Sequence, residues 1–405
     1  MKIKTRLQLS TLMFLQYFIW GAWYVTLNTF VGESLNFTGT QIGLCYGTFA
    51  IAAMVSPFFV GLVADKFFST EKVLGTMHIL GAIMLVITAQ AKTFGLFYPS
   101  LLIYTMTYTP TMALSNSLSF HQMKDPGKEF PGIRVLGTIG WIVANNVIGF
   151  MHFGSSVNQL YVAAIASILL GFYSFTLPHT PPKKEFTGGI KEILGFDALS
   201  LLKERAFSLI LIASILTCIP LSFYFGFTAS FMSDLDMKYI ANKISMGQVS
   251  EILFLLILPL FLKKYGVKKV FIIGMSAWLL RYVLFAFGDA DTLVWMIYLG
   301  IILHGICYDF FFVTGQIYVD KKAPKHLRSS AQGMITFATY GFGMFIGTWF
   351  SGKVVDFYSV VDGERVLHQW DKIWLIPAFI AFVVLILFAF IFKEKKQSEV
   401  STSTQ

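Results

Sequence analysis

The sequence predicts an all-α membrane protein of twelve transmembrane helices, arranged as two six-helix bundles. Three observations predict this fold. Hydrophobic residues make up 56% of the 405 residues and charged residues only 13%, whereas soluble domains have roughly 45–50% and 25%. The apolar residues form long blocks, and about 20 such residues cross a hydrocarbon core of ~30 Å as a helix. A connector rich in Pro, Lys and Gly separates six blocks from the next six.

The apolar blocks are too long and too uniform for barrel strands, and lipid offers no partner for free backbone groups, so helices are expected. The first block contains Gln16 and Asn28 and leads directly into the second, which is not typical of a cleaved signal peptide. The expected spans are residues 7–31, 40–64, 71–91, 97–122, 131–153, 157–178, 206–233, 244–264, 268–288, 292–319, 328–352 and 371–392.

The distribution of basic residues indicates the orientation of the chain. With a cytoplasmic N-terminus, 23 of the 31 Lys and Arg lie in cytoplasmic segments, and the acids show no such bias. By the positive-inside rule, both termini are cytoplasmic. The net charge of +9 is thereby explained without a nucleic acid partner. The expected domains are residues 1–178 and 206–393 for the two bundles, 179–205 for the linker and 394–405 for a disordered tail.

Cysteine usage and motifs argue against catalysis. Cys45, Cys218 and Cys307 lie in separate expected spans, a pattern that predicts neither a disulfide framework nor a metal site. The sequence contains no H-E-x-x-H and no G-x-S-x-G motif. We therefore expect a protein that is not an enzyme and that holds no cofactor.

Four charged residues lie inside expected spans, namely Arg134, Glu251, Arg281 and Asp309. A central charge costs about 2.5–3.5 kcal/mol on insertion scales, so such a residue normally faces a cavity or a partner. Arg281 is the exception, because it lies near the outer end of its span and could reach the interface or Asp289. A structural role is favoured for it.

Polar residues at helical spacing predict which faces line a cavity. Gln248 and Glu251 are three apart and His304 and Tyr308 four apart, so each pair shares a helix face. Asp309 follows Tyr308 directly.

A third stripe contains Arg134, Thr138 and Trp141, although Arg134 could equally extend to the interface. Two stripes remain open between cavity lining and packing: Gln16, Trp20 and Trp23 in span one, and Tyr104, Tyr108, Thr111, Ser115 and Asn116 in span four.

The loop after the second span resembles the G-x-x-x-D-[RK] signature of the major facilitator superfamily, with Gly61, Asp65 and Lys66 as a gating motif. The resemblance implies two bundles that rock about a site at the membrane midplane. Two G-x-x-x-G pairs, Gly43 with Gly47 and Gly343 with Gly347, predict close helix contacts.

The stretches "FPGIRVLGTIGW", "QVSEILFLLILPLFLKKYGVKKV" and "YDFF" resemble bacterial nucleoside permeases of the nucleoside:proton symporter family, over Leu7 to Lys393. The resemblance implies import of nucleosides with protons across the bacterial cytoplasmic (inner) membrane, with the proton as coupling ion. It implies substrate contacts by Arg134, Thr138, Trp141, Phe225, Gln248, Glu251, His304, Tyr308 and Asp309.

Of the implied site residues, Glu251 and Asp309 are the expected proton carriers, with His304 as a competitor. The sequence departs from the family, which usually has Phe at position 141, Tyr at 304 and Phe at 308. These departures leave a sugar:proton symporter of the same fold as an alternative, followed by an efflux antiporter. An intramembrane enzyme or a sensor is disfavoured. We expect a monomer in a lipid bilayer.

Overall fold

The computed structural model describes the chain except residues 1, 60–67, 182–195, 325–326, 363–364 and 393–405. The predicted gating motif (Gly61, Asp65, Lys66) and the predicted tail (394–405) lie outside the described residues. Helices occupy every expected span as far as it is described, with ends that differ from the expected ones by a few residues.

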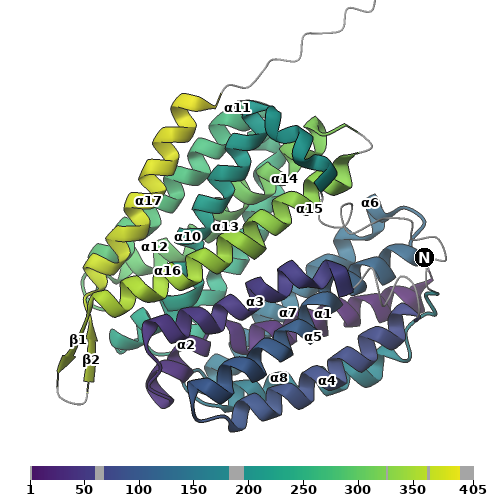
Figure 1. The fold of residues 1–405 in the computed structure, drawn as a ribbon, viewed down its shortest axis with the longest axis horizontal. Helices are drawn as coiled ribbons and strands as arrows, with labels where there is room; N and C mark the ends of the chain where they lie inside the picture. Colours follow the sequence, from purple (N-terminus) through teal and green to yellow (C-terminus); the bar gives the residue numbers. More distant parts are fainter. Residues whose placement is uncertain (1, 60–67, 182–195, 325–326, 363–364, 393–405) are drawn as a thin grey trace, which may run out of the picture.

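The N-terminal group of helices ends before the linker. It contains α1 (Ile3–Tyr24), α2 (Leu27–Thr29), the π-helix η1 (Phe30–Ser34), α3 (Gly39–Phe59), α4 (Thr70–Gln90), α5 (Phe94–His121), α6 (Pro126–Glu129), α7 (Pro131–Phe150) and α8 (Asn158–Ser174). Figure 1 shows these helices, purple to blue, on one side of the molecule.

The C-terminal group, teal to yellow, forms the other side. It contains the 3-10 helix η3 (Phe196–Lys203), α10 (Arg205–Asp234), α11 (Ile240–Phe287), α12 (Val294–Ile302), α13 (His304–Tyr308), the π-helix η4 (Asp309–Val313), α14 (Thr314–Lys322), α15 (Arg328–Thr336), the π-helix η6 (Phe337–Gly343), α16 (Met344–Phe357) and α17 (Trp370–Ile391).

The range given as α11 contains two expected spans, which form two helical segments that meet at a kink. The break between them lies at Gly266, whose backbone has φ 76° and ψ 168°. Glycine adopts such a positive φ without the steric cost that a Cβ would bring. The chain therefore turns between the two spans without a loop.

A short hairpin that was not predicted follows α16. Strands β1 (Ser359–Asp362) and β2 (Arg365–His368) pair antiparallel after α16. The signal was present in "SVVDGERVLH", because Asp-Gly between β-branched or apolar residues is a strong hairpin pattern.

The outer faces of the helices are apolar, as a lipid environment requires. Among the described residues, six helices are long and apolar enough to cross a membrane: Thr70–Gln90, Pro131–Phe150, Arg205–Asp234, Ile240–Phe287, Val294–Lys322 and Trp370–Ile391. Large hydrophobic side chains such as Leu256, Phe379 and Phe390 are exposed on these helices. Water would not stabilise such a surface, so the chain is a membrane protein.

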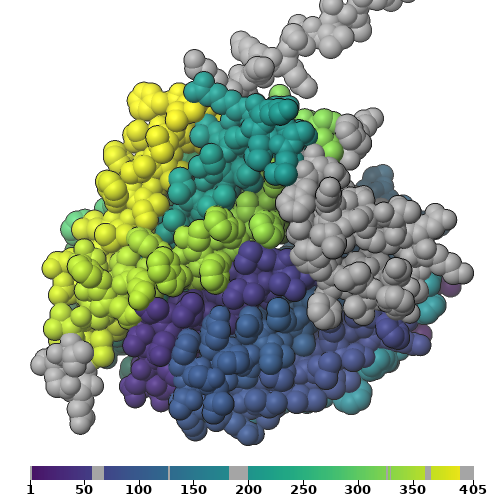
Figure 2. Space-filling model, viewed as in Figure 1, coloured from purple at the N-terminus to yellow at the C-terminus, as the bar shows by residue number. Residues whose placement is uncertain are grey.

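The two groups of helices meet most closely at one end of the molecule, which we call the clasped end. There α3 packs along α16, and Figure 2 shows the two helices in contact. The Asp356 carboxylate at the end of α16 accepts hydrogen bonds from the backbone amides of Gly39 and Thr40, at 2.5 and 2.9 Å, and from the Thr40 hydroxyl. A carboxylate is stabilised by the free amides of a helix N-terminus.

Glycines allow the backbones at the clasped end to touch. A Cβ on Gly43 would lie 2.1 Å from the carbonyl oxygen of Thr348, and one on Gly149 would lie 1.8 Å from Oδ1 of Asn242. Within the C-terminal group, a Cβ on Gly347 of α16 would lie 2.4 Å from Oγ of Ser222 and 2.8 Å from the carbonyl oxygen of Cys218 on α10. The close helix contacts predicted for the G-x-x-x-G pairs are confirmed.

Candidate functional site

A cavity lies between the two groups of helices, below the clasped end. It encloses about 870 Å³ of atom-free space, counted with the solvent at its opening. Its lining comes from α1, α3 and α7 on one side and from α10, α11, α13, η6 and α16 on the other: Tyr17, Trp20, Tyr24, Tyr46, Phe49, Ala50, Arg134, Thr138, Trp141, Leu221, Phe225, Gln248, Glu251, His304, Tyr308, Tyr340 and Met344.

Two opposite charges face each other in this cavity. Arg134 comes from α7 and Glu251 from α11, and their charges attract. The guanidinium carbon of Arg134 lies 4.1 Å from the centre of the Tyr17 ring, which adds a cation–π contact. The Glu251 side chain keeps 27% of its surface exposed. Both charges are therefore available to a ligand or to water in the cavity.

Helix α13 adds an imidazole and a phenol to the polar wall. Nε2 of His304 lies 3.9 Å from Oε2 of Glu251. The His304 ring stacks on Tyr224, with ring centres 4.8 Å apart and planes at 17°. One turn further on, the Tyr308 hydroxyl is hydrogen-bonded to that of Tyr340. The imidazole is thus held in place by stacking beside the carboxylate.

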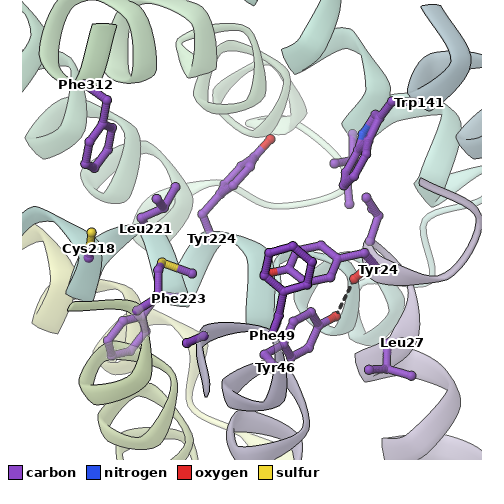
Figure 3. Packing of buried hydrophobic residues seen from close by; sticks show 14 of the residues in the cluster. Tyr24, Leu27, Tyr46, Phe49, Trp141, Cys218, Leu221, Phe223, Tyr224 and Phe312 are labelled. Carbon is purple, nitrogen blue, oxygen red and sulfur yellow. Dashed lines mark hydrogen bonds between the residues drawn. The ribbon is translucent and has the colours of Figure 1, made fainter. Parts of the chain in front are cut away.

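Aromatic rings form the opposite wall. Trp20 stacks on Phe49 with ring centres 4.6 Å apart, and it meets Trp141 edge to face at 4.8 Å. Tyr24 contacts Phe225 across the boundary between the two groups, at 5.7 Å. Figure 3 shows the Tyr46 hydroxyl bonded to the Tyr24 carbonyl oxygen, near the rings of Phe49 and Trp141. This wall suits a flat π system.

Several polar atoms of the cavity residues are buried and have no hydrogen-bond partner among the described residues. They are Nε1 of Trp20, Nε1 of Trp141, Oε1 of Gln248 and Nδ1 of His304. A buried polar atom without a partner costs free energy of about 1–3 kcal/mol. The described part of the chain therefore leaves buried polar atoms unpaired in four residues that line the cavity.

Eight of the nine predicted substrate residues line this cavity: Arg134, Thr138, Trp141, Phe225, Gln248, Glu251, His304 and Tyr308. The three predicted stripes each turn one face to it. The ninth residue, Asp309, does not line the cavity. Successive helix residues are about 100° apart, so Asp309 points away from the wall that contains Tyr308. Its side chain is fully buried, and both of its oxygens lack a partner in the described part of the chain.

Four tyrosines that line the cavity were not among the predicted residues, namely Tyr17, Tyr24, Tyr46 and Tyr340. Tyr17, Trp20 and Tyr24 follow each other at helical spacing on α1 and share the cavity face. The sequence contains this stripe, but it also contains the alternative stripe of Gln16, Trp20 and Trp23, and spacing alone does not decide between them. Tyr340 had no signal, because a single Tyr in an apolar helix is equally typical of packing.

The polar residues of span four point into the N-terminal group instead. Gln16 donates to Thr111 at 2.8 Å, and Nε2 of His78 lies 2.9 Å from Oε1 of Gln16. Ser115 and Tyr108 also bond to Gln16. This buried network is internally satisfied and connects α1, α4 and α5.

Arg281 reaches neither the interface nor Asp289, contrary to the expectation. It is fully buried, its Nε donates to the carbonyl oxygen of Gly300 at 2.9 Å, and its guanidinium carbon lies 4.2 Å from the centre of the Tyr224 ring. The aromatic neighbours of the side chain hold it inside the C-terminal group.

Helices with apolar outer faces, around a central cavity that contains charges, aromatic rings and unpartnered polar atoms, define a membrane transporter. The model of the nucleoside H+ symporter family matches residues 1–397. The chain belongs to this family, and it is a transporter rather than an enzyme. Its function is proton-coupled nucleoside transport.

Individual relatives agree with the family. The chain is 40% identical to the putative nucleoside transporter YegT of Escherichia coli K12, over 97% of this chain and 95% of that protein. It is 36% identical to nucleoside permease NupG of the same organism, over 99% and 98%. The crystal structure of NupG superposes with a TM-score of 0.88, over 97% of this chain and all of that one. A D-xylose–proton symporter, at 13% identity and a TM-score of 0.74 over 98% and 99%, shares the fold alone.

Proposed function

We propose that this protein imports nucleosides together with protons, and that the cavity between the two groups of helices is the substrate site. The observation that carries the proposal is the composition of the cavity. Two residues of opposite charge, a group of aromatic rings and four residues with unpartnered polar atoms line one cavity. A nucleoside has a flat base, base-edge donors and acceptors, and ribose hydroxyls, so it matches all three.

Recognition divides between the two walls. Trp20, Trp141 and Phe225 provide surfaces on which a base stacks. Gln248 and Glu251 accept hydrogen bonds from ribose hydroxyls or from the base edge, and Arg134 donates. Polar groups built to match a hydroxyl reject analogues that lack it, because the groups would then remain unpaired.

Proton coupling rests on Glu251 and Asp309. Glu251 is in the cavity beside His304 and opposite Arg134, so substrate and proton compete for or share its oxygens. Asp309 is buried one residue beyond Tyr308 and interacts electrostatically with Glu251. We propose that the two carboxylates exchange one proton between them during the transport cycle, and that the proton enters and leaves through the cavity.

The proposed arrangement in the membrane has twelve spans and both termini in the cytoplasm. Residues 1–178 and 206–393 form the two bundles that rock about the cavity, joined by a linker at 179–205. The clasped end is then the outer side, so the structure has its outer side closed. We further propose that the protein lies in the bacterial cytoplasmic membrane and is a monomer.

A competition assay tests the substrate class. Purified protein in proteoliposomes with an imposed inward proton gradient is expected to accumulate radiolabelled nucleoside. Unlabelled nucleosides should compete, whereas hexoses and pentoses at the same concentration should not. Competition by sugars alone would favour the sugar:proton symporter and contradict the proposal.

Removing an aromatic ring of the cavity tests the recognition. Trp141→Ala is expected to raise the half-saturation concentration for nucleoside on the order of ten- to a hundred-fold, since base–aromatic stacking contributes about 1–3 kcal/mol. Trp141→Phe should retain most of the affinity. Trp349→Ala, at a half-exposed Trp outside the cavity, is the matched control and should leave the concentration dependence of uptake unchanged. Equal effects at positions 141 and 349 would contradict the assignment.

A further inference from the structure

A second cavity opens at the clasped end, which is the outer side in the proposed topology. It measures about 970 Å³, counted with the solvent at its opening. Its lining comes from the end of α7 and the loop after it, the segment from α1 to α2, the end of α10 and the start of α11: Thr26, Thr29, Ile148, Gly149, His152, Gly154, Ser155, Ser233, Met237, Lys238, Tyr239, Ile240 and Ala241. We call it the vestibule.

The vestibule and the substrate cavity are built on the same helices. On α7, Ile148 follows the cavity residue Trp141 by seven positions, and on α11, Ala241 precedes the cavity residue Gln248 by seven. Seven residues of a helix rise roughly 10 Å. The two cavities therefore lie one above the other along the boundary between the two groups of helices, about two helical turns apart.

A thin layer of cross-group contacts separates the two cavities. Nδ2 of Asn242 donates to Oδ1 of Asn146 at 2.8 Å, and Nδ2 of Asn28 donates to the carbonyl oxygen of Gly226 at 2.9 Å. Gly149 lets Asn242 approach α7. These contacts join side chains and backbone of opposite groups, so they part when the groups rock. The vestibule then becomes continuous with the substrate cavity.

Two rings face this entrance. The centres of the His152 and Tyr239 rings are 5.2 Å apart, and each residue comes from a different group of helices. Tyr239 keeps 45% of its surface exposed, and His152 is also exposed. They therefore present an unshielded aromatic surface at the mouth of the path that leads to the aromatic wall below.

We propose that the vestibule is an entry site, where the base of a nucleoside stacks on Tyr239 and His152 before the outer contacts part. The proposal rests on the proposed function, because it takes the substrate and its direction from there. The ligand class follows from the lining, which offers exposed rings for a flat π face. Contact with both groups lets the entry site hold substrate above the layer that must open. The entry site thereby raises the local concentration of substrate only for molecules that arrive from the outer side.

Uptake into intact cells tests the entry site, because substrate then arrives only from outside. Tyr239 and His152 have φ of 55° and 54°, so asparagine, which tolerates this region, is the suitable replacement. Tyr239→Asn and His152→Asn are each expected to raise the half-saturation concentration for uptake about five- to tenfold, with an unchanged maximal rate. Tyr239→Phe, which keeps the ring, should resemble the unaltered protein.

Two further measurements separate this proposal from a loss of folding or a failure of the proposed function. Equilibrium binding of nucleoside to the solubilised variants should be unchanged, since the substrate cavity is intact. Asp236→Asn, in the same loop with φ 54° and outside the vestibule lining, should leave uptake unchanged. The entry site is refuted if both ring-deleting variants retain normal half-saturation while the unaltered protein transports nucleoside. Absence of nucleoside uptake by the unaltered protein would instead refute the proposed function.

Discussion

Glu251→Gln is expected to abolish nucleoside accumulation driven by a proton gradient while exchange of nucleoside across the membrane continues. Glutamine has nearly the size of glutamate and can still bond to substrate, but it cannot bind and release a proton. One proton moving inward contributes about 2.3 kcal/mol per 100 mV, enough for roughly 50-fold accumulation. In the variant, the ratio of internal to external substrate should fall to about one. Proteoliposomes with an imposed gradient measure the ratio, and counterflow of labelled substrate measures the exchange.

Two further variants complete this test. Asp309→Asn should also lower accumulation, because its carboxylate is buried without a partner in the described chain and interacts with Glu251. Asp125→Asn is the control, since Asp125 is exposed and pairs only with Lys128 at 3.4 Å among the described residues. If Glu251→Gln and Asp309→Asn both retain gradient-driven accumulation, the proposed coupling by carboxylates is wrong.

Gly43→Ala is expected to prevent closure of the clasped end and to reduce import on the order of a hundred-fold. The added Cβ would lie 2.1 Å from the carbonyl oxygen of Thr348. A backbone oxygen cannot move aside by rotating a side chain, so the two helices must separate. Overpacking of a close contact costs about 1–3 kcal/mol, which is large when the two states of a transporter differ by a few kcal/mol. The protein would then remain open to the outside.

Distances between spin labels at the outer ends of α3 and α16 measure this opening. Gly43→Ala should lengthen the distance and populate a single open state, with nucleoside still able to bind. Gly95→Ala is the matched control, because a Cβ there would meet no described atom within 4 Å. Normal uptake together with an unchanged label distance in Gly43→Ala would show that this contact does not seal the transport path.

Most of the fold could be predicted from the sequence because lipid imposes strong rules on composition. Apolar blocks of about 20 residues must be helices, and helices occupy every expected span as far as the structure describes it. The hairpin of β1 and β2 could not be predicted from apolar block length, because its signal is the Asp-Gly turn between two short strands. The π-helices η1, η4 and η6 were not predicted, because no residue pattern in the sequence marks them.

The cavity was predictable where several polar residues repeat along one helix face. The pair Gln248 and Glu251 shows this, since three residues bring both to one side of α11. Asp309 shows the limit of the argument. A charged residue in a span must face something other than lipid, but the sequence does not give the direction, which depends on packing. Arg281 shows the same limit, since one of the two rings that it contacts, Tyr224, comes from another helix, α10.

The kink of α11 at Gly266 has a practical consequence. The segment before the turn contributes Gln248 and Glu251 to the cavity, and the segment after it contains the buried Arg281. Gly266 has a non-helical backbone and interrupts the helix, so the angle between the two segments is set at this residue. A fluorophore attached at Lys264 or Lys268, beside the turn, would therefore report on the angle of the cavity wall from a position that touches neither substrate nor gate.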